Sequence, residues 1–92
     1  MTIALEGIVA LVTGANGGIG REVVKAMKAA GATVIASDLA DTDESGADHY
    51  SRHDVSKPED WQQIAAFVKT EFGHLDALVN NAGISTVASF EE

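Results

Sequence analysis

A glycine-rich junction between an apolar run and a helical pattern constrains this chain more than any other feature. The run Ile8–Thr13 is continuous and rich in β-branched residues, which is typical of a strand buried on both faces of a parallel sheet. The segment Thr13-Gly-Ala-Asn-Gly-Gly-Ile-Gly20 follows at once. Apolar side chains then recur at helical spacing, which predicts a helix over 19–30 that ends at Gly31 and has one face formed by Ile19, Val23, Met27 and Ala30.

The rest of the chain repeats this alternation. The segment Thr33–Ser37 predicts a second buried strand, His49–Val55 can hold a third, shorter one, and Leu75–Asn80 predicts a fourth strand. The link 39–48 has ten residues rich in Asp, Ser and Thr; it is barely long enough for a parallel crossover and is not expected to hold a full helix. Strands that alternate with helices predict βαβ units, and hence a parallel sheet with right-handed crossovers.

The helix before the last of these strands has well-marked ends. Ser56 and Glu59 have the spacing of an S-x-x-E capping box, Pro58 lies in the first turn, and Gly73 ends the pattern. Its apolar stripe consists of Trp61, Ile64, Ala65, Val68 and Phe72. A second S-x-x-E pattern, at residues 89–92, predicts the opening of a further helix.

The glycine junction has the chemistry that a diphosphate requires. The first turn of a helix offers unpaired backbone N–H groups at the positive end of its dipole. Gly14 permits a tight turn out of the strand, Gly18 admits phosphates, and Gly20 allows the helix to approach the sheet closely. A glycine turn without a ligand is the alternative, and the position between a strand and a helix argues against it. We expect Asn16 and Ile19, in the same segment, to contact the ligand as well.

Asp38 lies just past the second predicted strand, eighteen residues after Gly20. An acid at this position of a dinucleotide fold accepts hydrogen bonds from the adenosine ribose, and it would repel a 2′-phosphate. Residues 15–17 and Leu39, the next expected contact, include no Arg or Lys that could bind such a phosphate. The sequence therefore favours NAD over NADP, with a plain turn aspartate as the alternative for Asp38.

At this point the chain resembles the short-chain dehydrogenase/reductases. Its Thr-Gly-x-x-x-Gly-x-Gly segment matches their glycine signature, Asp54-Val55 matches the pair that meets the adenine ring, and Asn80-Asn-Ala-Gly83 matches their N-N-A-G segment. By this resemblance Asp54 bonds the adenine amino group. The expected cofactor-lining residues of the last segment are Asn81, Ala82 and Gly83, and Asn81 also steadies the central strands.

The resemblance implies a fold as well as a site. It implies a Rossmann-type doubly wound parallel sheet, of which residues 1–92 would hold only the N-terminal part, roughly four strands in the order 3-2-1-4. The fourth strand would then lie beside the first, so that Gly14 and Asn81 flank one crevice. Ligands of open α/β sheets bind at such a point, where the strand order reverses.

The resemblance also implies an activity whose catalytic residues this chain does not reach. Family members interconvert an alcohol and a ketone by hydride transfer, with a Tyr-x-x-x-Lys pair and an upstream Ser. The single tyrosine, Tyr50, is followed four residues later by Asp54 instead of Lys, so we assign no catalytic residue. One alternative is a dinucleotide-binding or interaction module without chemistry. Another is a nucleotide-dependent methyltransferase, against which the N-N-A-G segment argues.

Composition and charge narrow the classes of partner and the cellular location that we expect. A net charge of −8 argues against nucleic-acid binding, and the acidic stretch after Asp38 (Asp41, Asp43, Glu44 and Asp48) is expected to be a solvated loop. The chain has no cysteine, no apparent signal peptide and no apolar run of membrane-spanning length, so we expect a cytoplasmic protein.

His49 and His53 would lie about 13 Å apart on a strand, too far to share a metal ion, and are expected to be loop or surface histidines. The family resemblance implies a homo-oligomer.

Overall fold

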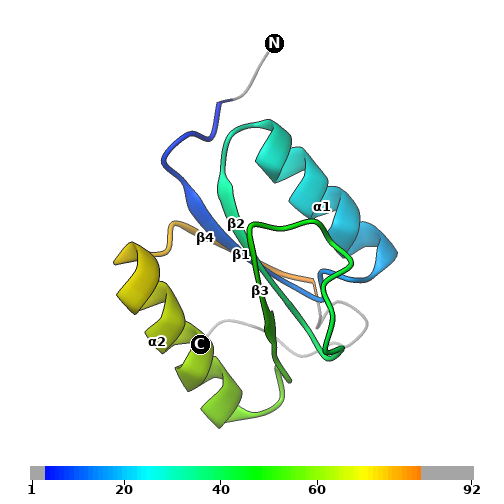
Figure 1. Cartoon of the computed structure of the whole chain (residues 1–92), viewed down its shortest axis with the longest axis vertical. Helices are drawn as coiled ribbons and strands as arrows, with labels where there is room; N and C mark the ends of the chain where they lie inside the picture. The colour runs from blue at the N-terminus through cyan, green and yellow to red at the C-terminus, as the bar shows by residue number, and fades with distance from the viewer. Residues whose placement is uncertain (1–3, 82–92) are drawn as a thin grey trace.

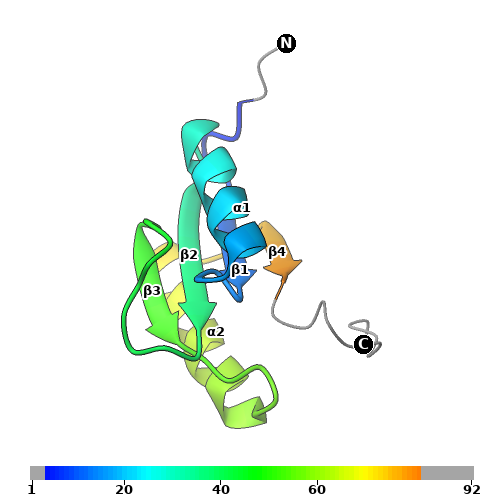
Figure 2. The ribbon, with the colours of Figure 1, turned by 90° about the vertical axis from the view of Figure 1, so that its right-hand side faces the viewer.

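The computed structural model describes residues 4–81, which form one parallel sheet and two helices (Figure 1). The strands β1 (Val9–Thr13), β2 (Thr33–Asp38), β3 (His49–Arg52) and β4 (Ala77–Asn80) lie in the order β3-β2-β1-β4. Helix α1 (Gly18–Ala29) covers one face of the sheet and helix α2 (Pro58–Phe72) covers the other (Figure 2). This arrangement confirms the doubly wound α/β fold and the strand order 3-2-1-4.

Strand β1 is the centre of the sheet. It pairs with β2 as far as Thr13 and Ser37, and with β4 as far as Thr13 and Asn80. All five of its residues are buried, which explains why its sequence is a continuous apolar run instead of an alternating one. Because the three strands are in register at this end, Thr13, Ser37 and Asn80 lie side by side at the carboxyl edge of the sheet.

The core has two apolar layers, because successive side chains of a strand point to opposite faces. The layer under α1 is built around Val12, Val24, Val34 and Ala36. The layer under α2 is built around Val9, Leu11, Ile35, Ile64 and Val68. The two helices therefore depend on alternate residues of the same two strands, β1 and β2.

The ends of the helices agree with prediction in part. Helix α1 stops at Ala30, before Gly31, and α2 stops at Gly73, whose φ of 81° is the left-handed conformation that favours glycine. Of the predicted apolar face of α1, Val23 and Met27 pack against the core and Ala30 is half-buried, whereas Ile19 is 62% exposed. The fully buried residues of the helix are Gly20 and Val24.

The predicted capping box at Ser56 is wrong. The N-cap of α2 is Lys57, and no side chain makes a cap hydrogen bond there. Instead, the Asp54 carboxylate accepts the N–H of Ser56 at 2.9 Å and its hydroxyl at 2.6 Å. An aspartate two residues upstream competes for the same serine, because such local side-chain bonds rival helix caps.

The link 39–48 contains no helix, as its length predicted, and its acidic residues are exposed. Asp48 is nevertheless anchored: it accepts the Val34 N–H at 2.8 Å and pairs with Lys28 at 3.4 Å. The backbone hydrogen bond from Val34 is the main reason why the pKa of Asp48 lies below its usual value. One carboxylate of the acidic stretch thus ties the end of this link to β2 and to α1.

His53 is buried, which corrects the expectation of a surface histidine; only 2% of it is exposed. Its Nδ1 lies 3.0 Å from the Ser37 hydroxyl, and its ring meets Trp61 edge-on at 4.3 Å between centroids. Alternation along the chain places His53 on the same side of the sheet as Ser51, under α2, where Trp61 covers it. His49 is exposed, as expected.

The α2 side of the sheet keeps an apolar groove of about 450 Å³. Its lining includes Leu11, Ile64 and Val68, together with Leu75 and Leu78, which are 41% and 39% exposed. The groove lies beside the edge strand β4, where no further strand follows among residues 4–81. Neither helix in this part of the chain is long and apolar enough to cross a bilayer.

The buried histidine predicts a pH dependence of stability. Burial lowers the pKa of His53, and the carboxylates of Asp60 and Asp54 oppose that shift without cancelling it. Below the ordinary histidine pKa of about 6.5, the unfolded chain takes up a proton that folded His53 resists. We therefore expect the free energy of unfolding to fall as the pH is lowered from 7.5 to 5.5, measured by chemical denaturation.

A matched pair of variants isolates this effect. His53→Gln, which can still bond Ser37, should lose most of the decrease between these two pH values, whereas His49→Gln should keep it. An equal decrease in wild type and His53→Gln would show that another group causes it.

Candidate cofactor-binding site

A cleft of about 290 Å³ opens at the carboxyl edge of the sheet. It lies where the chain order reverses, since β1 leads through α1 to β2 on one side and has β4 on the other. Six of the expected contact residues line it, and two further residues line it that the sequence analysis did not propose. The lining is Gly14, Gly17, Asp38, Leu39, His53, Asp54, Val55 and Asn81.

The glycine segment turns the chain from β1 into α1. Gly14 has a φ of 65°, a left-handed conformation that side chains disfavour. Gly17 is the N-cap of α1, and no side chain caps the helix or places an acid in its first turn. The unpaired N–H groups of that first turn therefore have no acidic or capping side chain from their own segment.

Gly18 and Gly20 differ in what a side chain would meet. A Cβ at Gly20 would collide with the Gly14 carbonyl oxygen and lie 2.8 Å from the Ala15 Cα. A Cβ at Gly18 would meet no atom of the described part of the chain within 4 Å. The fold itself thus requires glycine at position 20, where α1 approaches β1, but gives no internal reason for glycine at position 18.

Side-chain hydrogen bonds join the glycine segment to the end of β4. The Asn81 amide donates to the Gly14 carbonyl at 3.0 Å, and the Thr13 hydroxyl donates to the Asn80 amide oxygen at 3.0 Å. These residues are 67 positions apart in the sequence. Gly14 and Asn81 therefore flank one crevice, as the family's strand order implied; Ala82 and Gly83 lie outside the described residues.

Asp38 ends β2 at the rim of the cleft. One carboxylate oxygen accepts the Leu39 N–H at 2.7 Å and the other accepts the Asn16 N–H at 2.8 Å. A carboxylate has about four acceptor positions, so both oxygens can accept further bonds. Asp38 is half-buried, and Leu39 beside it is 58% exposed.

Arg52 is a cation near Asp38 that lies outside residues 15–17 and 39. Arg52 lies opposite Asp38 in the backbone register between β3 and β2. Its Nε donates to the Leu39 carbonyl at 3.0 Å and lies 3.3 Å from the exposed carboxylate of Asp41. Arg52 is therefore partly engaged within the loop, and Asp41 offsets its charge.

Asp54 and Val55 follow β3 and line the cleft, as does His53, which precedes them. Asp54 is fixed on both sides: its N–H donates to the Asp60 carboxylate at 2.9 Å, and one carboxylate oxygen binds Ser56. The hydrogen bonds from Ser56 lower the pKa of Asp54, so it is ionised at neutral pH. The Val55 carbonyl accepts the Trp61 indole N–H at 2.8 Å.

Two lining residues were missed, and both had a signal in the sequence. Gly17 lies inside the glycine segment 13–20, whose other glycines were predicted to form the diphosphate site. His53 directly precedes Asp54. Because side chains alternate between the two faces of a strand, His53 is expected on the face opposite to that of Tyr50. Ile19 and Gly18, both expected contacts, are exposed at the start of α1 but do not line the cleft. Among residues 4–81, no cluster of His, Asp or Glu could hold a metal ion.

Comparison with known proteins agrees with this geometry. A family model for the short chain dehydrogenases matches residues 8–92. The chain is 43% identical to a 3-beta-hydroxysteroid dehydrogenase of Comamonas testosteroni over 91 residues, which cover 91% of this chain and 36% of that protein. It is 37% identical to a D-beta-hydroxybutyrate dehydrogenase of Cupriavidus necator, covering 96% of this chain and 38% of that protein.

A solved structure shows the same similarity to hydroxysteroid dehydrogenases at the level of the fold. The crystal structure of hydroxysteroid dehydrogenase from Escherichia coli superposes with a TM-score of 0.74 at 32% sequence identity, covering 84% of this chain and 37% of that one. The chain thus spans between 36% and 38% of the length of these three proteins. By its motifs, its strand order and these matches, the chain belongs to the short-chain dehydrogenase/reductase family.

Proposed function

We propose that this chain is the NAD-binding part of an oxidoreductase that interconverts an alcohol and a ketone by hydride transfer. The observation that carries the proposal is Gly18. No atom of residues 4–81 occupies the space that a side chain there would fill, yet the residue is glycine at the open start of α1. A ligand that approaches the helix amides closely accounts for this glycine, and a diphosphate is the group that helix N-termini bind.

The proposed contacts extend along the cleft from this point. The diphosphate lies against the first turn of α1, with Gly14 and Gly18 leaving it room and Ile19 beside it. Asp38 accepts the ribose hydroxyls, next to Leu39. Asp54 and Val55 meet the adenine, and the segment Asn81–Gly83 lines the far side of the cleft. These roles come from the family resemblance, and the positions around the cleft of Gly14, Asp38, Leu39, Asp54, Val55 and Asn81 support them.

We propose NAD as the preferred dinucleotide because of the charge around Asp38. A 2′-phosphate carries up to two negative charges and would lie against this carboxylate. Arg52 is the cation that could oppose that effect, but its guanidinium already contacts the Leu39 carbonyl and Asp41. Repulsion by Asp38 is therefore expected to dominate.

The proposed substrate is a small molecule with a hydroxyl or ketone group. The two curated relatives described above are named for a hydroxysteroid and a hydroxybutyrate, both hydroxyl-bearing. We assign no catalytic residue to this chain and propose that residues 1–92 are part of a larger domain whose Ser, Tyr and Lys lie outside them. The cofactor supplies the hydride chemistry, and these residues bind and orient it.

The two glycines provide the first test. Gly18→Ala should leave the free energy of unfolding unchanged or slightly higher, because alanine favours the helix and meets no clash. It should weaken NAD binding by about tenfold or more, which corresponds to roughly 1.4 kcal/mol. Gly20→Ala should instead destabilise the fold by about 1–3 kcal/mol, because its Cβ meets backbone atoms.

These effects are measured by calorimetric titration of NAD and by chemical denaturation of the intact protein. Unchanged NAD affinity in Gly18→Ala would contradict the proposed diphosphate position.

Asp38 provides the second test. Asp38→Ala should weaken NAD binding by about ten- to a hundredfold, because hydrogen bonds to charged groups contribute about 1.5–3 kcal/mol. The same change should weaken NADP binding much less, since it also removes the repulsion. Glu44→Ala, which removes an exposed carboxylate from the following loop, is the matched control and should change neither affinity by more than about twofold. An NAD affinity that survives Asp38→Ala intact would remove the ribose assignment.

A further inference from the structure

The side chain of Asn16 is occupied by the protein itself. Its Nδ2 donates to the Thr42 carbonyl at 3.0 Å and to the Tyr50 hydroxyl at 3.3 Å, and its Oδ1 accepts the Glu44 N–H at 2.8 Å. Both N–H groups of the amide are thereby used. Asn16 was expected to contact the dinucleotide, but these bonds direct its side chain to the link 39–48 instead.

The backbone of Asn16 is what meets the candidate site. Its N–H donates to the Asp38 carboxylate at 2.8 Å, and it is one of two backbone donors that orient this group. The position of the Asn16 backbone therefore sets the direction of the Asp38 oxygens. Whatever fixes Asn16 also fixes Asp38.

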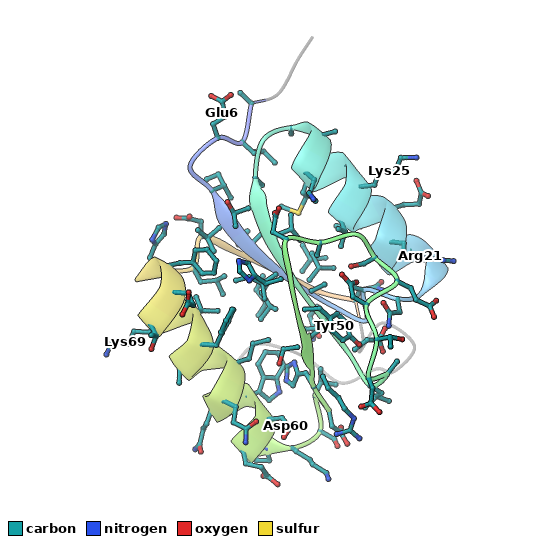
Figure 3. The ribbon with its side chains drawn as sticks, in the orientation of Figure 1. Glu6, Arg21, Lys25, Tyr50, Asp60 and Lys69 are labelled. Atoms are coloured by element: carbon teal, nitrogen blue, oxygen red, sulfur yellow. The ribbon has the colours of Figure 1, made fainter. Side chains whose placement is uncertain are left out.

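Tyr50 is the group that fixes Asn16 from the sheet. It projects from β3 on the α1 side, toward the link 39–48 (Figure 3). Its hydroxyl donates to the Ala40 carbonyl at 2.6 Å and accepts from Asn16. Burial, followed by the nearby charge of Asp38, raises the pKa of Tyr50, so the hydroxyl keeps its proton at neutral pH.

We propose that Tyr50 and Asn16 are positioning residues that hold the Asp38 carboxylate in the direction in which it selects a ribose with a free 2′-hydroxyl. The Tyr50 hydroxyl joins β3 to the link and to the glycine segment, and Asn16 passes this constraint to Asp38 through its backbone N–H. The inference depends on the proposed NAD-binding function. It adds two residues that would not touch the dinucleotide and a role in choosing between NAD and NADP.

The test separates this role from a merely structural one by measuring both dinucleotides. Tyr50→Phe keeps the packed ring and removes the hydroxyl. We expect it to weaken NAD binding by about three- to tenfold, the effect of one or two hydrogen bonds, and to weaken NADP binding less. Asn16→Ala, which keeps the backbone N–H but loses the side-chain bonds, should change the NADP-to-NAD affinity ratio in the same direction.

The matched control is Ser51→Ala. It removes a hydroxyl from the next residue of β3, which points to the opposite face, and it should leave the ratio unchanged. Affinities are measured on the intact protein by calorimetric titration with NAD and with NADP, and the unfolding midpoint is recorded for each variant. In an Asp38→Ala background, Tyr50→Phe should have no further effect on the ratio, because its action passes through Asp38.

Each other outcome overturns the inference. If Tyr50→Phe and Asn16→Ala weaken both dinucleotides equally, the residues only support the fold. If their effect on the ratio persists without Asp38, they act by another route. In both cases wild-type NAD binding leaves the proposed function standing, whereas a wild-type protein that binds neither dinucleotide refutes that function and this inference together.

Discussion

The backbone of α1 comes so close to the end of β1 that position 20 has no room for a Cβ atom. This contact sets the direction in which the helix leaves the sheet, and with it the place of the first-turn amides at the carboxyl edge. The Asn81 amide bonds the same Gly14 carbonyl that a side chain at position 20 would strike. The end of β4 is therefore positioned against the turn that glycine makes possible, and the cleft forms between them.

The sheet supplies the second constraint, because its strands are in register at this edge. Backbone pairing aligns Thr13, Ser37 and Asn80 at this edge. The residues just after them therefore lie close together without the need for side-chain contacts between distant parts of the chain. Ser37 and His53 also bond beneath the cleft, and the His53 N–H donates to the Asp38 carbonyl at 2.8 Å. The strand ends that carry Asp38 and Asp54 are thus held by both main-chain and side-chain bonds.

The sequence was informative where one local signal decides the structure. The apolar run of β1, the glycines that end both helices and the short acidic link each predicted what is observed. The convergence of Gly14 and Asn81 needed the strand order, which came from the family resemblance and not from any local pattern. Ser56 was misread because Asp54 competes for it, and His53 because its burial depends on Trp61, a residue of the next helix. Tyr50 was identified only as not catalytic, since its partners in the link have no sequence signature.

The distribution of charge explains how a protein of net charge −8 can suit an anionic ligand. The first turn of α2 contains Glu59 and Asp60, and Asp60 already accepts a backbone N–H there. The first turn of α1 contains no acid. The acids that line the cleft are Asp38, at the end proposed for the ribose and next to the acidic link 39–48, and Asp54, at the position proposed for the adenine. Because salt screens exposed charges beyond about 8 Å, the amides of α1 would act locally on the proposed diphosphate, and the Asp38 carboxylate would act locally on the 2′-position. In the proposed binding mode, one end of the cleft attracts the diphosphate that NAD and NADP share. The other end repels the 2′-phosphate that only NADP carries.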